Sequence, residues 1–196
     1  MTRFVGLTGG IGAGKSEALA AFERLGAATL STDRIAHDLL DDPEVKAALV
    51  ERWGDEIAPS GEVDRERVGR IVFNDPGELA WLESVTHPRV GAHVLEWRRS
   101  LDPGVEVAVV EVPLLFEAAM EGAFDATVAV VADDQLRDAR LRQRGQGGLE
   151  GREARQLDQA EKARRADHII RNDASLEELE SEVKRVIGKL SGGGDG

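Results

Sequence analysis

The sequence contains no cysteine among its 196 residues and no apolar run that approaches membrane-spanning length. Without cysteine, disulfide bonds, thiolate chemistry and cysteine-ligated zinc are excluded, and a reducing compartment is permitted. The opening segment MTRFVGLTGG lacks the long apolar stretch of a signal peptide. We therefore expect a soluble, cytoplasmic protein with no membrane partner.

Basic residues are too few to balance the acidic ones, because 25 Lys and Arg stand against 37 Asp and Glu and give a formal net charge of -12. Binding of a polyanion depends on clustered basic side chains that release counterions, so a general nucleic-acid surface is disfavoured. Arginines do gather in residues 137–144 and 152–165. Most of these are interpreted as solvated helix faces with intrahelical ion pairs, and one or two are candidates for function.

What the sequence does contain is a series of short β-rich runs that alternate with helical patterns. In the first half, residues 3–7 and 27–30 are predicted strands, and residues 17–25 between them show helical spacing. Residues 35–100 are helical in pattern almost throughout, with breaks at Asp42-Pro43, Pro59–Gly61, Asn74–Gly77 and Pro88. This stretch is interpreted as a helical insertion.

Three further strands are predicted in the second half, at residues 105–112, 126–131 and 168–171. The first is apolar and β-branched almost throughout, as in a strand buried on both faces, and we expect it to be the central strand. The sequence Ser-Leu-Glu-Glu at Ser175 predicts a capping box for a last helix that ends near Leu190.

Five buried strands alternating with helices predict an α/β fold, with a parallel five-stranded sheet covered by helices on both faces. We expect one domain over residues 1–190, with its core in 1–34 and 103–190 and the helical insertion in about 35–102. Residues 191–196 are interpreted as a flexible tail without a role. Ligands of such sheets bind at the carboxyl ends of the strands.

A phosphate-binding loop lies between the first predicted strand and helix. Residues 9–16 read GGIGAGKS and satisfy G-x-x-x-x-G-K-[ST], which predicts a P-loop NTPase-type fold. Its glycines let backbone N–H groups approach the phosphates of ATP, Lys15 is expected to bridge the β- and γ-oxygens, and the Ser16 hydroxyl to ligate Mg²⁺. The alternative is a purely structural glycine-rich turn. The predicted nucleotide-binding residues are Gly9, Gly12, Ala13, Gly14, Lys15, Ser16 and Glu17.

The absence of two GTPase motifs and the length of the chain narrow the class of P-loop protein. No N-K-x-D and no D-x-x-G sequence occurs, so the usual guanine-binding and γ-phosphate-sensing elements of GTPases are missing. The chain is also too short for most motors. A small-molecule kinase remains.

Seven segments in order then carry a resemblance over nearly the whole chain: LTGGIGAGKS, STDRIAHDL, GEVDRERVGRIVF, LESVTHPRV, VEVPLLFE, RLRQR and ADHIIRN. The chain resembles the dephospho-CoA kinases. This implies ATP-dependent phosphorylation of the ribose 3′-hydroxyl of dephospho-CoA, the last step of CoA biosynthesis, by a monomer or small homo-oligomer whose partner is that small molecule. The alternatives are another P-loop metabolite kinase with a nucleotide or sugar acceptor, and a non-catalytic ATP-binding module.

Asp33 follows the second strand at the position of the acidic residue that the family places there. The resemblance implies that it is the catalytic base and contacts the acceptor, and a carboxylate at a strand's carboxyl end could take the proton of a hydroxyl. The alternative is an N-cap for a helix that begins near Arg34. The family often has Asp where this chain has Ser31, and Arg where it has His37.

The resemblance also implies residues that bind the acceptor and the metal. His87 in Thr86-His87-Pro88 matches an element of the insertion that would cover the acceptor, although a buried histidine beside a helix-starting proline is the alternative. Leu114 and Leu115 would line the acceptor site. Glu111 stands where the family has Asp and would hold a Mg²⁺-bound water, or would pair with a basic neighbour.

The remaining implied residues contact the nucleotide. Arg140 matches an arginine of a helical lid at about residues 140–166, where it would stabilise the transferred charge. Asn172 matches the position that approaches the adenine, although an asparagine that closes a strand is the alternative. Glu17 departs from the threonine that is common in the family, and we expect its carboxylate to turn away from the phosphates, toward water or a neighbouring arginine.

Overall fold

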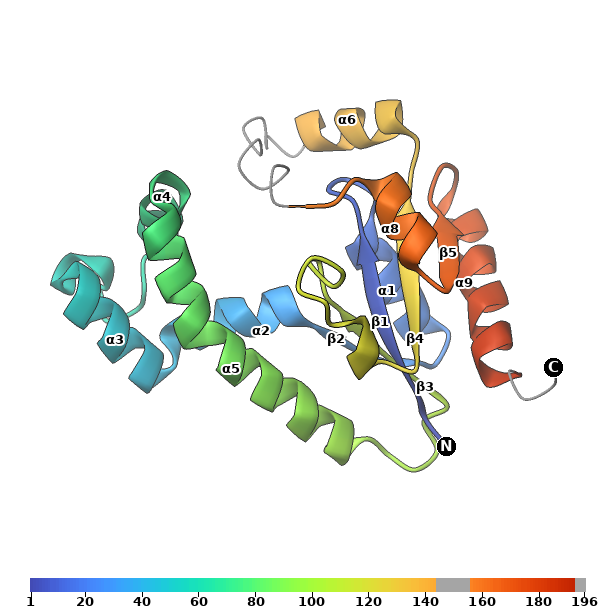
Figure 1. The fold of residues 1–196 in the computed structure, drawn as a ribbon, viewed down its shortest axis with the longest axis horizontal. Helices are drawn as coiled ribbons and strands as arrows, with labels where there is room; N and C mark the ends of the chain where they lie inside the picture. Colours follow the sequence, from blue (N-terminus) through green and yellow to red (C-terminus); the bar gives the residue numbers. More distant parts are fainter. Residues whose placement is uncertain (144–155, 193–196) are drawn as a thin grey trace. The chain divides into compact units, whose positions relative to one another are not determined.

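The structure is a computed structural model of the chain, and it describes residues 1–143 and 156–192 (Figure 1). The chain forms two compact units. The sheet unit comprises Met1–Ser31 and Ser100–Gly196, and the helical unit comprises Thr32–Arg99. Each boundary falls three residues before the one expected from the sequence, at 31/32 instead of 34/35 and at 99/100 instead of 102/103.

The sheet unit contains five parallel strands in the order β2-β3-β1-β4-β5. Their bounds are β1 Arg3–Gly9, β2 Ala28–Ser31, β3 Val107–Glu111, β4 Ala126–Val131 and β5 His168–Arg171. The predicted five-stranded parallel sheet is therefore confirmed. The prediction that residues 105–112 form the central strand is wrong, because β1 occupies the middle and pairs with both β3 and β4.

This error has a physical reason. Both β1 and β3 are buried on both faces over almost their whole length. Hydrophobic pattern reports how completely a strand is covered, but it does not report which neighbours the strand pairs with.

Successive side chains of each strand point to opposite faces, and different elements cover the two faces. On one face, Val5 and Leu7 of β1 pack with α1 (Lys15–Arg24) and α9 (Leu176–Ser191), which lie beside each other (Figure 1). On the other face, Thr8 of β1 contacts α8 (Gln159–Arg165), and Leu115 fills the space beside Gly6. Helices on both faces were predicted.

The remaining helices in the described part of the sheet unit are short. They are η3 (Glu121–Ala123) and α6 (Asp134–Gln143). The predicted cap of the last helix is present, since the Ser175 hydroxyl accepts a hydrogen bond from the Glu178 N–H at 3.3 Å. Of the expected lid at 140–166, residues 144–155, including Arg144 and Arg152, lie outside the described residues, as do residues 193–196 of the expected tail.

The helical unit has its own hydrophobic core. Its elements are α2 (Thr32–Asp38), η1 (Leu39–Asp41), α3 (Pro43–Trp53), η2 (Asp55–Ile57), α4 (Arg65–Asn74) and α5 (Pro76–Ser100). Buried side chains from η1, α3, η2 and α4 form the core. Trp53 and Trp81 pack against this core, and their two rings meet edge to face. Asp42 and Asp64 cap α3 and α4, and each accepts two backbone N–H bonds.

The predicted helix break at Pro88 is wrong, because α5 runs through it without interruption. Pro88 removes the hydrogen bond to the Ser84 carbonyl. At the next pair of residues along the helix, the Arg89 side chain donates to the Val85 carbonyl at 2.9 Å. Trp81 and Val85 are packed on the core of the unit, so tertiary packing keeps the segment helical despite the proline. No described helix is both long and apolar enough to cross a membrane.

Candidate active site

The P-loop joins the carboxyl end of β1 to the first turn of α1. Gly12 has φ 77° and Gly14 has φ 90°, in the left-handed region that a side chain disfavours. The Ala13 N–H closes a turn onto the Gly10 carbonyl at 3.2 Å. Lys15 folds back over this loop, and its Nζ donates to the carbonyls of Gly9 and Gly10, both at 3.1 Å. The P-loop thus joins strand and helix as the motif predicts, with the first-turn N–H groups of α1 beside it.

Ser16 and Glu17 are exposed in the first turn of α1. The Glu17 carboxylate forms an ion pair with Arg24 of the same helix at 3.1 Å. The expectation that Glu17 turns toward a neighbouring arginine is therefore confirmed. Its carboxylate also gains from the positive end of the helix dipole.

We predict that Glu17→Thr changes the KM for ATP by less than about threefold. The exposed pair with Arg24 contributes little, and the backbone N–H that serves a nucleotide does not depend on the side chain. Steady-state kinetics at low and high salt measure the effect, with Glu23→Thr on the same helix as a control. A KM about tenfold lower in Glu17→Thr, returning to the wild-type value at high salt, would show instead that the carboxylate repels the nucleotide.

Two side chains from later elements reach the carboxyl end of the P-loop. Asn172, directly after β5, is buried, and its Nδ2 donates to the Ala13 carbonyl at 2.9 Å. Arg140 of α6 donates from Nη2 to the Asn172 carbonyl at 3.0 Å. The other terminal nitrogen, Nη1, is buried without a hydrogen-bond partner in the described part of the chain. The structure therefore brings the side chains of Arg140 and Asn172 to the Gly14 end of the P-loop.

Glu111 ends β3 and is buried, with 5% of its surface exposed. It lies in register with Leu7 of β1 on one side and with Ser31 of β2 on the other. This places a carboxylate at the carboxyl edge of the sheet, as predicted. Within residues 1–143 and 156–192, no three His, Asp or Glu side chains form a ready metal cluster.

The segment after β3 differs from the prediction at one residue. Leu114 is partly exposed, but Leu115, expected to line the acceptor site, is fully buried. Its Cδ1 occupies the space where a side chain at Gly6 would lie. Leu115 therefore belongs to the core because β1 has no side chain there.

Asp33 and His87 belong to the helical unit. Helix α2 begins at Thr32, so Asp33 lies inside its first turn and is not the N-cap that the alternative required. Its carboxylate is exposed, two residues after the end of β2. His87 is also exposed on α5, so the alternative of a buried histidine is wrong.

A buried lysine that the sequence did not indicate links three segments of the sheet unit. Lys162 of α8 is fully buried and donates from Nζ to the Pro113 carbonyl at 2.6 Å. It forms an ion pair with Glu117 at 3.0 Å, and Glu117 also accepts the Leu157 N–H at 2.8 Å. Burial lowers the pKa of Lys162, and the hydrogen bond and charge of Glu117 oppose that shift. The only apolar residues of α8 are alanines, which are too small to fill the space beneath the helix. That lack of larger apolar residues was the available signal that the stem of Lys162 points inward.

We predict that Lys162→Met lowers the free energy of unfolding by about 3–5 kcal/mol, because it leaves the Glu117 carboxylate buried without its charge partner. Urea unfolding measures this. Lys184→Met on the exposed face of α9 should change stability by less than about 0.5 kcal/mol. The double variant Lys162→Met/Glu117→Leu should recover much of the loss, and a double variant no more stable than Lys162→Met would contradict the buried-pair explanation.

The fold and the loop define the class of protein: a P-loop kinase, with a phosphate cradle at the carboxyl end of the central strand of a parallel sheet. The family model for dephospho-CoA kinase matches residues 3–178, and the chain belongs to this family. A dephospho-CoA kinase of Symbiobacterium thermophilum is 38% identical over 99% of this chain and 84% of its own length.

Solved structures agree. The dephospho-CoA kinase from Campylobacter jejuni is 30% identical with a TM-score of 0.72, and the match covers 98% of this chain and 99% of that one. A shikimate kinase from Bacteroides thetaiotaomicron has a TM-score of 0.53 at 18% identity, covering 96% of this chain and 97% of that one, and it shares the fold.

Proposed function

We propose that this protein transfers the γ-phosphoryl group of ATP to the ribose 3′-hydroxyl of dephospho-CoA, giving CoA and ADP, the last step of CoA biosynthesis. The observation that carries the proposal is the P-loop at the end of β1 in a chain whose family match runs from residue 3 to residue 178. The short chain and the absence of guanine-binding motifs support ATP as the donor.

The nucleotide phosphates bind in the P-loop. Backbone N–H groups and the first turn of α1 supply the donors, and the Lys15 ammonium exchanges its two carbonyl partners for β- and γ-phosphate oxygens. The phosphate oxygens are stronger acceptors than the carbonyls because they are charged. The same lysine therefore bridges two carbonyls of the loop in the structure and neutralises charge that develops during transfer.

Asp33 accepts the proton of the acceptor hydroxyl. Its position two residues after β2 and its exposed carboxylate support this role, since a general base must be reachable by the substrate. His87 on α5 and Leu114 after β3 are proposed to contact the acceptor, and both are accessible. Leu115 acts through packing alone.

The residues present fit Mg²⁺. A hydroxyl at Ser16 and a carboxylate at Glu111 are oxygen donors, and Mg²⁺ in kinases typically takes one or two such protein ligands, with phosphate oxygens and waters completing its shell. When bound, the ion neutralises charge on the phosphates. Ser16 would hold it directly and Glu111 through water.

Arg140 stabilises the phosphates from beside Gly14. Its Nη1 is buried and has no hydrogen-bond partner among the described residues, which supports this assignment, because a buried guanidinium donor without a partner is costly unless a ligand supplies one. Asn172, whose side chain donates a hydrogen bond to the Ala13 carbonyl, is proposed to lie close to the adenine. The protein is proposed to act in the cytoplasm, as a monomer or small homo-oligomer.

A panel of acceptors separates this function from its rivals. ATP-dependent ADP release is measured with dephospho-CoA, AMP, adenosine and shikimate at equal concentrations. Of these four acceptors, we expect only dephospho-CoA to cause ADP release. Turnover with another acceptor would assign a different metabolite kinase, and tight ATP binding without acceptor-dependent ADP release would assign a binding module.

A further inference from the structure

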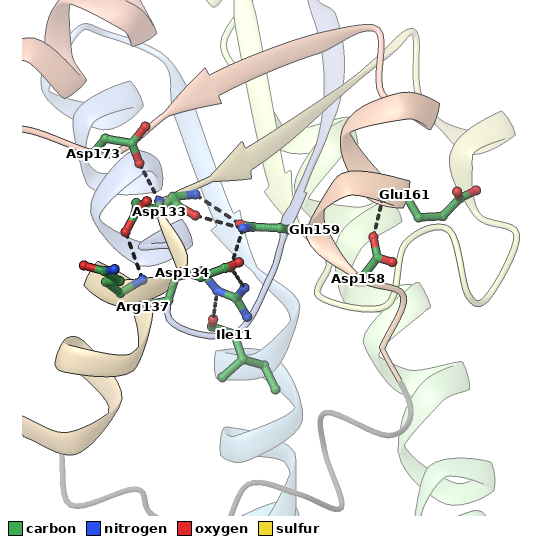
Figure 2. Close-up of polar contacts among 10 residues, drawn as sticks. Ile11, Asp133, Asp134, Arg137, Asp158, Gln159, Glu161 and Asp173 are labelled. Carbon is green, nitrogen blue, oxygen red and sulfur yellow. Dashed lines mark hydrogen bonds and ion pairs between the residues drawn. The ribbon is translucent and has the colours of Figure 1, made fainter.

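Arg137 of α6 makes a contact with the P-loop that the proposed mechanism does not use. Its Nε donates to the Ile11 carbonyl at 2.9 Å, and its Nη1 forms an ion pair with Asp134 at 2.8 Å (Figure 2). The side chain is only 20% exposed, although it carries a charge. Helix α6 also packs directly on the loop, because a side chain at Gly12 would lie 3.1 Å from the Arg137 carbonyl.

The direction of this contact matters for the loop. In a trans peptide the C=O and the following N–H point in opposite directions. A donor that holds the Ile11 carbonyl on the α6 side therefore holds the Gly12 N–H on the other side. Asn172 acts in the same way on the Ala13–Gly14 peptide, two peptides later. Its hydrogen bond to the Ala13 carbonyl directs the Gly14 N–H away from Asn172.

The anchor is itself held from two further elements. One Asp134 oxygen, Oδ1, accepts from Arg137 Nη1 and from Gln159 Nε2, the latter at 3.0 Å (Figure 2). The Gln159 amide is fixed on the end of β4, because Nε2 donates to the Ala132 carbonyl at 2.8 Å and Oε1 accepts the Ala132 N–H at 3.1 Å. The contacts run from β4 and α8 through Asp134 to Arg137 and the loop.

We propose that Arg137 is a positioning residue that fixes the Ile11–Gly12 peptide so that the Gly12 N–H faces the bound phosphates. Gly12 lacks a side chain and has φ 77°, so its neighbouring peptides have conformational freedom that must be lost on binding. Arg137 removes that freedom before the nucleotide arrives. Losing the anchor should therefore weaken nucleotide binding by roughly 5- to 30-fold, which corresponds to the entropy of ordering about one backbone residue. This inference rests on nucleotide binding by the proposed kinase and is independent of the acceptor.

The test is calorimetric titration of ADP into Arg137→Met, which keeps an unbranched apolar stem and removes the hydrogen-bond donors. The matched control is Arg185→Met. Arg185 also pairs with an acid three residues earlier, Glu182 at 2.7 Å, and donates to a backbone carbonyl, Ile169 at 3.3 Å, but on β5. We expect the Kd for ADP to rise roughly 5- to 30-fold in Arg137→Met and less than about twofold in Arg185→Met, with Arg137→Lys between them.

A second variant separates positioning from simple attraction of phosphate by a positive charge. Asp134→Ala removes a negative charge close to Arg137, so attraction alone predicts tighter ADP binding. Positioning predicts weaker binding, because Arg137 loses the partner that orients it. A Kd for ADP within twofold of wild type in folded Arg137→Met, or tighter binding in Asp134→Ala, would overturn the proposal. Neither result depends on whether dephospho-CoA is the acceptor.

Discussion

Replacement of Lys15 by alanine should lower kcat by roughly 10³-fold while the protein keeps its fold. Lys15 is the cation that the P-loop itself provides, and in the structure its Nζ lies on the Gly9 and Gly10 carbonyls at the mouth of the loop. Alanine leaves the backbone donors in place, so nucleotide binding should weaken less than turnover. The charge that develops on the transferring group would then lack its nearest stabilising cation.

Rapid-quench measurement of the chemical step, beside a thermal unfolding curve, tests this prediction. Lys46→Ala is the matched control, because Lys46 also donates to a backbone carbonyl, that of Gly61 at 2.9 Å, in the helical unit. The control should keep kcat within about twofold of wild type. Near-normal turnover in folded Lys15→Ala would remove Lys15 from the mechanism.

Asp33→Asn should lower kcat by roughly 10²- to 10⁴-fold and leave the Kd for ATP nearly unchanged. Asparagine has the size of aspartate but cannot take a proton at neutral pH. The structure excludes an N-cap role, since Asp33 lies inside the first turn of α2, where its charge contributes about 0.3–1 kcal/mol through the helix dipole. A loss of activity much larger than the loss of stability therefore indicates chemistry.

The control for Asp33 is Asp38→Asn at the other end of α2, where the side chain is also exposed. Its kcat should stay within about twofold of wild type. If Asp33→Asn lowers stability by about 1 kcal/mol but retains kcat, Asp33 serves only the helix and the base must be sought elsewhere.

The sequence predicted the P-loop well because the motif is local. Its glycines, lysine and first helical turn are contiguous, so composition and spacing alone determine the loop. The five strands were predicted for the same reason, since each is a short run with a clear apolar pattern. The Glu17 orientation followed from local electrostatics and one nearby arginine.

The sequence did not predict features that depend on pairing between distant segments. The order of strands was misjudged at β3, because β1 and β3 are both buried on their two faces and burial does not reveal which strand is central. Leu115 was assigned to a ligand surface because its burial depends on the missing side chain of Gly6. Lys162 and Arg137 resembled ordinary helix-surface residues, since their partners Glu117 and Ile11 are far away in the chain.

The most direct test of the account is to identify the product of a single reaction. The purified protein is incubated with dephospho-CoA and ATP labelled on the γ-phosphate, and the labelled product is examined by mass spectrometry and phosphorus NMR. The account predicts one ADP per labelled phosphate, with the phosphate on the ribose 3′-oxygen, and no label transfer in Lys15→Ala or Asp33→Asn on the same timescale. Label at any other position, or ADP formed at the same rate without dephospho-CoA, would contradict it.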